Sequence, residues 1–293
     1  MRFSVAFILT AVSLASATAI GRQSVQNVHL AVQPKCGSFS GAPADVNAGI
    51  RSLSNYKTIV AFGDAWTDGG VRDGSPVKPA VITPPSPNAG GRMCDGPVWV
   101  ESLAKKAGAT LKDYAAAGAV VDSTQYPGKV FSGNDFFTQT NLFTGQGVRY
   151  DPDTTLYTVF FGIGDFDAGG DLDVVAQNIA FRVLALTSSP NFARNILIVD
   201  NYGRGNQTRA GEAFKKSVFS SLRYLRAGGV NVAFVDLANV WNAILGSSPG
   251  YKAFGYTNAG ACTVSSQTTI GACSDPEHSL YWIPGEVFYA RSK

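Results

Sequence analysis

The segment Thr58-Ile59-Val60-Ala61-Phe62 continues directly into Gly63-Asp64-Ala65-Trp66-Thr67-Asp68-Gly69-Gly70. Its first five residues are apolar or β-branched, which is typical of a buried β-strand, and the Gly-Asp pair that follows is typical of a turn. Four other short runs share this apolar composition, at residues 111–114, 156–161, 196–199 and 230–235. Apolar residues at helical spacing lie between them, at residues 98–106, 172–187 and 213–227.

This alternation of strands and helices predicts the fold class. Continuous apolar strands separated by amphipathic helices form a mainly parallel sheet that is covered on both faces. We therefore expect an α/β protein: a three-layer α/β/α sandwich around a mainly parallel five-stranded sheet. Because ligands of such sheets bind beyond the carboxyl ends of the strands, the site is expected just after Phe62, Tyr114, Phe161 and Val235.

The composition of the 293-residue chain limits the classes of partner. Hydrophobic residues make up 45% of the chain and charged residues 15%, which is enough apolar material for a core. The net charge is +3, and the basic residues form no run or stripe of the kind that binds phosphates. We expect no nucleic acid partner.

Residues 1–19 have the features of a secretory signal peptide. Arg2 supplies a positive start, residues 5–14 are apolar, and Ala17-Thr18-Ala19 is a cleavage pattern. The apolar run is shorter than the roughly twenty residues that span a bilayer, and no later stretch is long enough. We expect an exported protein without a membrane partner, with an N-terminal extension at residues 20–55 and one domain at residues 56–293.

The four cysteines suit an oxidising compartment. Cys262 and Cys273 flank a polar segment and are close enough in sequence to close one loop with a disulfide. Cys36 and Cys94 remain as a possible second pair. Four cysteines allow three connectivities, however, and the sequence does not choose among them.

The sequence predicts no metal and no cofactor, and it contains one candidate site of modification. The cysteines have no metal-ligand spacing, and His29 and His278 are the only histidines. Asn206-Gln207-Thr208 is a glycosylation sequon in a polar stretch, so Asn206 is the expected acceptor.

Five segments along the chain carry characteristic residues. The first is residues 63–70, quoted above. The others are Gly91-Arg92-Met93-Cys94-Asp95-Gly96-Pro97-Val98-Trp99-Val100-Glu101, Tyr114-Ala115-Ala116-Ala117-Gly118-Ala119, Leu156-Tyr157-Thr158-Val159-Phe160-Phe161-Gly162-Ile163-Gly164-Asp165 and Cys273-Ser274-Asp275-Pro276-Glu277-His278-Ser279-Leu280-Tyr281-Trp282-Ile283-Pro284-Gly285. Together they resemble the sequence blocks of SGNH (GDSL-type) hydrolases. The last one resembles the run before the catalytic histidine in secreted fungal carbohydrate esterases of family 16, which are acetylesterases.

The resemblance extends over residues 56–285 and carries several expectations. It implies a flavodoxin-like SGNH fold, with hydrolysis of acetyl esters on sugars as the family activity. The expected ligand is an acetylated sugar or a small ester, and the expected state is a monomer. A His-Pro pair and a final helix would follow Gly285 in the family, whereas this chain continues differently to Lys293. The domain is therefore expected to lack the family's last helix.

Three positions depart from the family's catalytic pattern. In the family a serine attacks the ester carbonyl, a histidine takes its proton, and N–H donors stabilise the oxyanion. The serine position is Ala65, the position of an asparagine donor is Gly164, and the histidine position is Glu286. The resemblance implies that the N–H of Gly118 remains as an oxyanion donor, because it needs no side chain. We expect a pseudoenzyme whose catalysis is impaired or lost.

No other residue is an evident replacement for the missing groups. His278 follows Asp275 by three positions, but a similar Asp-Pro-x-His in the relatives is separate from the catalytic histidine, and a packing role is the simpler interpretation. Ser123 and Thr67 are nearby hydroxyls without an evident base. A carboxylate such as Glu286, near the end of the chain, is more often solvated than used to activate water.

Several side chains are expected to support the site. Asp64, Asp68 and Asp165 lie near strand ends, where carboxylates commonly cap helices or fix loops. The resemblance implies a structural role for the first and the last of them. Trp66 and Trp99 are candidates to line a sugar-binding cleft, although aromatic residues near a site belong more often to the core.

Three functions remain open at this point. The first is an esterase-like protein, related to carbohydrate acetylesterases, with impaired catalysis. The second is a binding module that holds an acetylated sugar without turnover. The third is a true acetylesterase whose last block is replaced by translation past an exon boundary after Gly285, which would explain the tail but not Ala65 or Gly164. Substrate preference is expected to lie in loops at residues 74–91 and 125–150.

Overall fold

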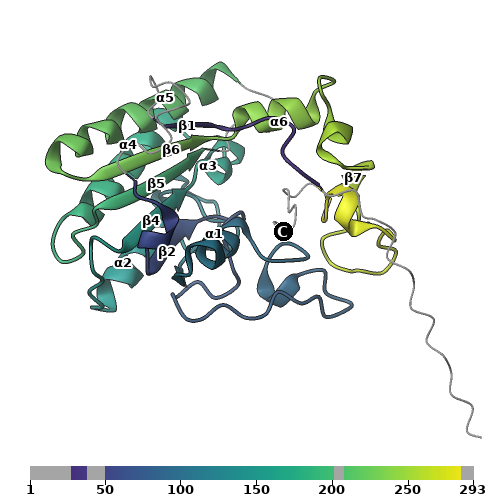
Figure 1. Ribbon diagram of the computed structural model, residues 1–293, viewed down its shortest axis with the longest axis horizontal. Coiled ribbons are helices and arrows are strands. Elements are labelled where there is room, and N and C mark those ends of the chain that lie inside the picture. Colours follow the sequence, from purple (N-terminus) through teal and green to yellow (C-terminus); the bar gives the residue numbers. More distant parts are fainter. Residues whose placement is uncertain (1–27, 38–49, 201–207, 285–293) are drawn as a thin grey trace, which may run out of the picture.

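The computed structural model describes residues 28–37, 50–200 and 208–284. The predicted signal peptide, Asn206 of the sequon and Glu286, at the predicted position of the general base, lie outside these residues. The described chain folds around a six-stranded sheet, and a smaller two-stranded sheet lies at one end of the molecule (Figure 1).

The large sheet has the strand order β1-β6-β5-β4-β2-β3. Its strands are β1 (Lys35–Gly37), β2 (Thr58–Gly63), β3 (Thr110–Asp113), β4 (Thr155–Phe160), β5 (Asn195–Asp200) and β6 (Asn231–Asp236). The five neighbouring strands from β6 to β3 are parallel, which confirms the predicted sheet. β1 pairs antiparallel with β6 and comes from the segment predicted as an N-terminal extension. Its three residues, Lys-Cys-Gly, carry no strand-like pattern.

The order of the parallel strands determines where a ligand site forms. β2 lies between β3 and β4. After β2 the chain adds β3 on one side of it, and then adds β4, β5 and β6 in turn on the other side. This is the 2-1-3-4-5 order of flavodoxin-like sheets, whose ligands bind where the strand order reverses. That point is the carboxyl edge of β2 and β4, which Ala65 and Gly164 follow in the chain.

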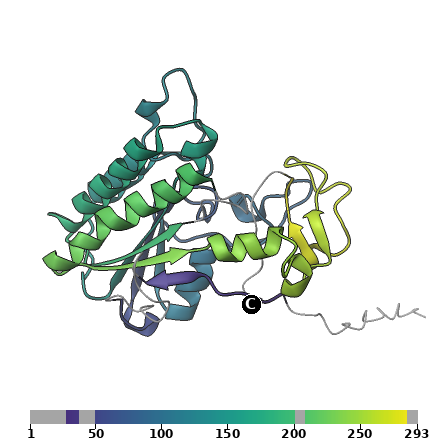
Figure 2. The same ribbon diagram turned by 90° about the horizontal axis from the view of Figure 1, so that it is seen from above.

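Helices cover both faces of the sheet (Figures 1 and 2). The longer helices are α1 (Trp99–Ala107), α2 (Phe136–Gly145), α4 (Leu172–Thr187), α5 (Arg209–Arg223) and α6 (Ala238–Leu245), and a short α3 (Ile163–Asp167) follows β4. Successive side chains of a strand point to opposite faces. Val60 and Phe62 accordingly belong to the apolar core under α2, α4 and α5, and Ile59 and Ala61 to the core under α1. The three-layer sandwich is therefore confirmed.

Short 3-10 turns occur at η1 (Leu53–Asn55), η2 (Ala89–Gly91), η3 (Ser123–Gln125), η4 (Tyr224–Gly228), η5 (Tyr251–Phe254) and η6 (Pro276–His278). The helix predicted at residues 213–227 starts earlier, because Thr208 caps α5 by accepting a hydrogen bond from Gly211 N at 3.0 Å. It then ends in the tighter turn η4. Within the described residues, no helix has both the length and the hydropathy to cross a bilayer.

The prediction of a loop at residues 125–150 was wrong, because this segment contains α2. Asp135 caps the helix by accepting a hydrogen bond from Thr138 N at 2.7 Å. The buried face of α2 includes the polar side chains Gln139 and Thr140 beside Phe136. The spacing of apolar residues reveals a helix only when its buried face is apolar. Because two of the buried residues of α2 are polar, the sequence did not predict this helix.

A small lobe follows α6 and carries the two-stranded sheet of β7 (Asn258–Ala261) and β8 (Ser279–Tyr281), yellow in Figures 1 and 2. The predicted disulfide between Cys262 and Cys273 is present in this lobe. The loop at residues 74–91 packs against it. Trp282 donates from Nε1 to Pro87 O at 2.7 Å, and the backbone N–H of Thr269 donates to Pro85 O at 2.8 Å.

Candidate functional site

The turn after β2 holds Ala65 at the carboxyl edge of the sheet. Asp64 organises this turn, since its carbonyl accepts hydrogen bonds from Thr67 N at 3.1 Å and Asp68 N at 3.0 Å. Its Oδ1 accepts another from Trp66 N at 3.0 Å. Asp64 is buried, whereas Ala65 is partly exposed. The turn therefore keeps a tight hydrogen-bonded form around a residue that offers only a methyl group.

Gln139 of α2 fixes the end of β2. Its Oε1 accepts a hydrogen bond from Gly63 N at 3.0 Å, and its Nε2 donates to Gly63 O at 2.9 Å and to Asn134 O at 2.7 Å. The side chain is fully buried. This amide bonds both backbone groups of the residue just before Asp64, whose carbonyl also accepts a hydrogen bond from Ala116 N at 3.1 Å. Nothing in the local sequence distinguishes Gln139 from an ordinary polar residue, so the sequence analysis missed it.

Asp68 joins the loop after β2 to the loop after β3. Its carboxylate accepts hydrogen bonds from Gly70 N and from Ala117 N, both at 2.7 Å, and pairs with Arg72 at 3.0 Å. Asp68 is fully buried. Because Ala117 directly precedes Gly118, the carboxylate sets the position of the predicted oxyanion donor.

Asp113, at the end of β3, makes a second connection between the same loops. Its Oδ2 accepts a hydrogen bond from Gly69 N at 2.7 Å, and its Oδ1 accepts one from Ala115 N at 2.9 Å. The side chain is fully buried. Burial raises the pKa of Asp113 well above its ordinary range, although these two hydrogen bonds act in the opposite direction. The sequence analysis did not identify this residue.

Gly118 presents one N–H group at this edge. Its φ of 79° lies in the left-handed region that favours glycine, and the residue is exposed. The N–H groups on either side are occupied, since Ala117 donates to Asp68 and Ala119 donates to Ala116 O at 3.0 Å. Among the described residues, the N–H of Gly118 has no hydrogen-bond partner. It is therefore open to an acceptor on a ligand.

Backbone atoms pack closely around Gly164, the position at which the sequence resemblance predicts an asparagine. A Cβ on Gly164 would lie 2.7 Å from Ala119 O and 3.4 Å from Val120 Cγ1. The nearer atom is a backbone oxygen, which cannot rotate away as a side chain would. A side chain at position 164 therefore requires the loop after β3 to shift. The backbone around position 164 is therefore fitted to a glycine and leaves no room for the predicted asparagine.

Asp165 anchors the loop after β3 from the start of α3. Its carboxylate accepts hydrogen bonds from Val121 N at 3.1 Å and from the hydroxyl of Tyr126 at 2.7 Å. The side chain is fully buried. Burial raises the pKa of Asp165 to about 6, and these hydrogen bonds oppose the rise without cancelling it. Its contacts are those of a residue that holds the loop.

This pKa predicts a pH-dependent contribution to stability. The folded-state pKa of about 6 lies above the value of about 3.9 for an exposed aspartate, so the stabilising effect of Asp165 is complete below about pH 4 and is lost as the pH rises through 6. We expect the difference in free energy of unfolding between the unsubstituted chain and Asp165→Asn to fall by about 2–3 kcal/mol between pH 4 and pH 7. Urea titrations at a series of pH values measure it. Parallel pH profiles for the two proteins would contradict this prediction.

The two candidate sugar-binding tryptophans lie in different surroundings. Trp66 is only 7% exposed, and its ring centroid lies 5.9 Å from that of Phe160 and 5.3 Å from that of Trp241. Trp66 is therefore a core residue, which corrects its candidacy for a sugar-binding cleft. Trp99 is partly buried and donates from Nε1 to Thr67 Oγ1 at 3.2 Å, which ties α1 to the turn after β2.

The alternative catalytic groups have structural contacts. His278 lies in η6 with its Nδ1 2.8 Å from Asp275 Oδ1, in the lobe of β7 and β8. The hydroxyl of Ser123 donates to Asp135 Oδ2 at 2.6 Å, where it supports the start of α2. Thr67 is fully buried under the turn. None of these contacts pairs a hydroxyl with a basic nitrogen.

Cys94 is a free, buried thiol, so it does not form the possible second disulfide. Its Sγ donates to Gly96 O at 2.9 Å, and burial raises the pKa of the Cys94 thiol to about 12. The thiol is therefore uncharged and unreactive at neutral pH. In the part of the chain that the structure describes, no group of three or more His, Cys, Asp or Glu side chains is arranged to hold a metal ion.

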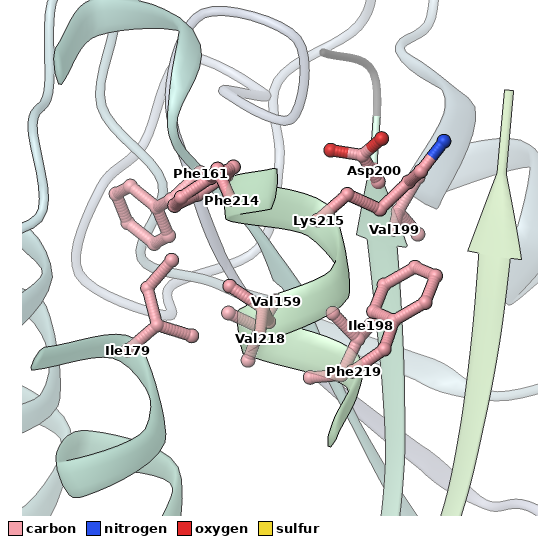
Figure 3. A pocket seen from close by; sticks show the side chains of 10 residues that line it. All are labelled: Val159, Phe161, Ile179, Ile198, Val199, Asp200, Phe214, Lys215, Val218 and Phe219. Carbon is pink, nitrogen blue, oxygen red and sulfur yellow. The ribbon is translucent and has the colours of Figure 1, made fainter. Parts of the chain in front are cut away.

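A cavity under α4 and α5 does not provide a ligand site (Figure 3). It measures about 10 Å³, which accommodates about one water molecule, and apolar side chains form most of its lining. Asp200 and Lys215 lie at one end of it. Lys215 Nζ is 2.9 Å from Asp236 Oδ2 and 2.9 Å from Glu212 Oε1. Burial lowers the pKa of Lys215, but these hydrogen bonds outweigh that effect and raise it, so the side chain is a charged structural group.

No family model matches the sequence, and no curated protein matches it. Among solved structures, the chain is similar to a family two carbohydrate esterase from Clostridium thermocellum in complex with cellohexaose, with 17% identity, a TM-score of 0.41, and coverage of 61% of this chain and 53% of that one. It is also similar to Axe2, an acetylxylan esterase from Geobacillus stearothermophilus, with 14% identity, a TM-score of 0.37, and coverage of 64% and 80%.

A member of the lipolytic G-D-S-L family from Veillonella parvula is similar as well, with 17% identity, a TM-score of 0.38, and coverage of 60% of this chain and 76% of that one. The chain spans about half the length of the Clostridium thermocellum esterase that it matches. At these identities and TM-scores, the likenesses carry no argument about the chemistry of this chain.

Proposed function

We propose that this chain is an exported SGNH-type protein, related to carbohydrate acetylesterases, that binds an acetylated sugar without hydrolysing it at the rate of a serine hydrolase. Two observations support the family: the five sequence blocks in order along the chain, and the 2-1-3-4-5 sheet with the first and fourth of those blocks at its switch point. Export is supported by the signal-peptide pattern of residues 1–19.

One observation carries the proposed loss of catalysis. Ala65 occupies a turn in which two backbone N–H groups donate hydrogen bonds to Asp64 O. The side-chain amide of Gln139 also bonds the backbone N–H and carbonyl of Gly63. The turn is thus maintained while the attacking hydroxyl is absent. The nearby N–H of Gly118 is exposed and has no hydrogen-bond partner in the described residues. The site therefore keeps a group that binds a carbonyl oxygen and lacks the group that attacks the carbonyl carbon.

The remaining groups define what this site can do to an acetyl ester. The N–H of Gly118 polarises a carbonyl oxygen, and a fixed donor of this kind also stabilises an oxyanion. Without a hydroxyl at position 65, no covalent acyl intermediate forms there. Loss of the nucleophile or base in a serine hydrolase costs about 10⁴ to 10⁶ in turnover, and oxyanion stabilisation leaves a residual rate. The expected behaviour is binding with slow hydrolysis at most.

Binding and turnover measured on the same preparation test this proposal. Calorimetric titration with acetylated xylo-oligosaccharides is expected to give saturable binding, and the same oligosaccharides after chemical deacetylation are expected to bind at least about tenfold more weakly. Hydrolysis of p-nitrophenyl acetate is expected to stay near the uncatalysed rate. Turnover at the rate of an ordinary esterase would overturn the proposal, and so would flat titrations with acetylated xylan, chitin and pectin fragments.

A further inference from the structure

The loop at residues 126–134 closes one side of the Gly118 turn. The hydroxyl of Ser132 donates a hydrogen bond to Ala117 O at 3.3 Å. A Cβ on Gly133 would lie 2.5 Å from the same carbonyl oxygen, so the two backbones approach as closely as a glycine permits. Ser132 itself is exposed. The loop therefore forms a wall of the site that includes a solvent-accessible hydroxyl.

Contacts outside the site hold this loop in place. The hydroxyl of Tyr126 donates to Asp165 Oδ1 at 2.7 Å, and the ring of Phe131 lies 5.3 Å from the ring of Tyr126. Lys129 donates from Nζ to the carbonyl of Ala168, just after α3. A ligand would therefore meet Ser132 in a preformed position, with little ordering of the loop to oppose binding.

Ser132 is also close to the open N–H group. A Cβ built on Gly118 would lie 2.3 Å from Ser132 Oγ. Since a carbon–carbon bond adds about 1.5 Å, Ser132 Oγ lies within about 4 Å of the Gly118 Cα. The positive φ favours a glycine at position 118, and the Ser132 hydroxyl occupies the space that a Cβ would take.

The two groups have complementary hydrogen-bonding character. The N–H of Gly118 is a donor. The hydroxyl proton of Ser132 is directed to Ala117 O, which leaves the lone pairs of Ser132 Oγ as acceptors toward the solvent. A ligand that satisfies both presents a carbonyl oxygen and, beside it, a hydroxyl group. An acetyl ester next to a free hydroxyl on a sugar ring has this arrangement, whereas a fully acetylated sugar has only acceptors.

We propose that Ser132 is a ligand-binding and specificity-determining residue of this site, and that it selects partly acetylated sugars with a free hydroxyl beside the acetyl ester. This inference rests on the proposed function and adds the substrate class. The acetyl carbonyl accepts a hydrogen bond from Gly118 N–H, and the neighbouring sugar hydroxyl donates to Ser132 Oγ. Gly118 N–H and Ser132 Oγ thus bind the ligand beside Ala65, and no covalent step is required.

Calorimetry with a methyl xyloside monoacetate and with the corresponding triacetate tests this inference. The unsubstituted chain is expected to bind the monoacetate about fivefold more tightly than the triacetate, the size of one net hydrogen bond. Ser132→Ala is expected to lose about fivefold in affinity for the monoacetate and to leave triacetate binding unchanged. Ser54→Ala is a matched control, because Ser54 is an exposed serine in η1, before β2 and at the opposite edge of the sheet.

The outcomes separate this inference from the proposed function. If the unsubstituted chain binds neither ligand and also fails to bind acetylated xylan, chitin and pectin fragments, the proposed function fails and this inference fails with it. If it binds such fragments but neither xyloside, only this inference is overturned. If both ligands bind but Ser132→Ala leaves their affinity ratio unchanged, only the role of Ser132 is overturned. Thermal unfolding of Ser132→Ala is expected to match that of Ser54→Ala, so an altered ratio with an unchanged Tm reports on ligand contact rather than on folding.

Discussion

An Ala65→Ser/Gly164→Asn double variant is expected to remain about 10⁴-fold or more below the turnover of a serine hydrolase on p-nitrophenyl acetate. The new hydroxyl would lack a base, because a serine needs a neighbouring group to take its proton and the sequence resemblance predicts Glu286 at the histidine position. The asparagine would not reach a donor position either, because its Cβ alone would lie 2.7 Å from Ala119 O. Ala65→Ser alone is expected to gain less than about tenfold over the unsubstituted chain.

The same steric argument makes a stability prediction for position 164. Gly164→Ala and Gly164→Asn are each expected to lower the free energy of unfolding by about 1–3 kcal/mol, the usual cost of overpacking. In an open helical position a glycine-to-alanine change stabilises by up to about 1 kcal/mol, so the sign of the change is diagnostic. Gly145→Ala in α2 is the control, since a Cβ there meets nothing within 4 Å.

Two measurements decide these expectations, thermal unfolding and initial rates on p-nitrophenyl acetate. A double variant that regains about 10³-fold in rate and keeps the Tm of the unsubstituted chain would show that the loop after β3 accommodates an asparagine. That result would also remove the steric part of the argument for a lost active site. A drop in Tm for Gly164→Ala but not for Gly145→Ala would support the steric argument at position 164.

The parts of the fold that were predictable are those in which one strand or helix carries its own apolar signal. β2 and β4 are continuous apolar strands, and α4 was predicted with its observed bounds because its apolar residues follow helical spacing. β1 and α2 had no such signal. β1 is three residues long and depends on pairing with β6, and α2 buries the amide of Gln139 to reach Gly63. Elements defined by tertiary contacts leave little trace in a local pattern.

The candidate site divides in the same way. The order of the blocks placed Ala65, Gly118 and Gly164 at one edge of a sheet before any geometry was known, because parallel strands end at a common edge. The approach of Ala119 O to Gly164 and of Ser132 to Gly118 could not be predicted, since each joins segments whose contact depends on the path of a loop. Trp66 was a candidate for a sugar-binding cleft because it follows Ala65 in the sequence, but its side chain packs on Trp241, as the commoner core role predicts.

The guanidinium of Arg92 is fully buried. It connects α1 to the loop at residues 74–91, which contacts the small lobe of β7 and β8. Its Nε and one terminal nitrogen donate to the two carboxylate oxygens of Glu101, each at 2.7 Å. Arg92 also donates to Ala89 O at 3.0 Å and to Lys78 O at 2.8 Å. Glu101 in turn accepts from Val98 N at 2.9 Å, at the start of α1. The buried guanidinium therefore links two carbonyls of the loop at residues 74–91 to the start of α1.

Arg92→Ala is expected to lower the free energy of unfolding by about 3–5 kcal/mol, because it leaves the Glu101 carboxylate without its cation and two loop carbonyls without donors. Arg223→Ala, which removes an exposed arginine from the end of α5, is the control and is expected to change it by less than about 0.5 kcal/mol. Urea unfolding measures both, and limited proteolysis is expected to cut Arg92→Ala first within residues 74–91. A cost below about 1 kcal/mol, with that loop still resistant, would mean that its contacts with Thr269 and Trp282 hold it without Arg92.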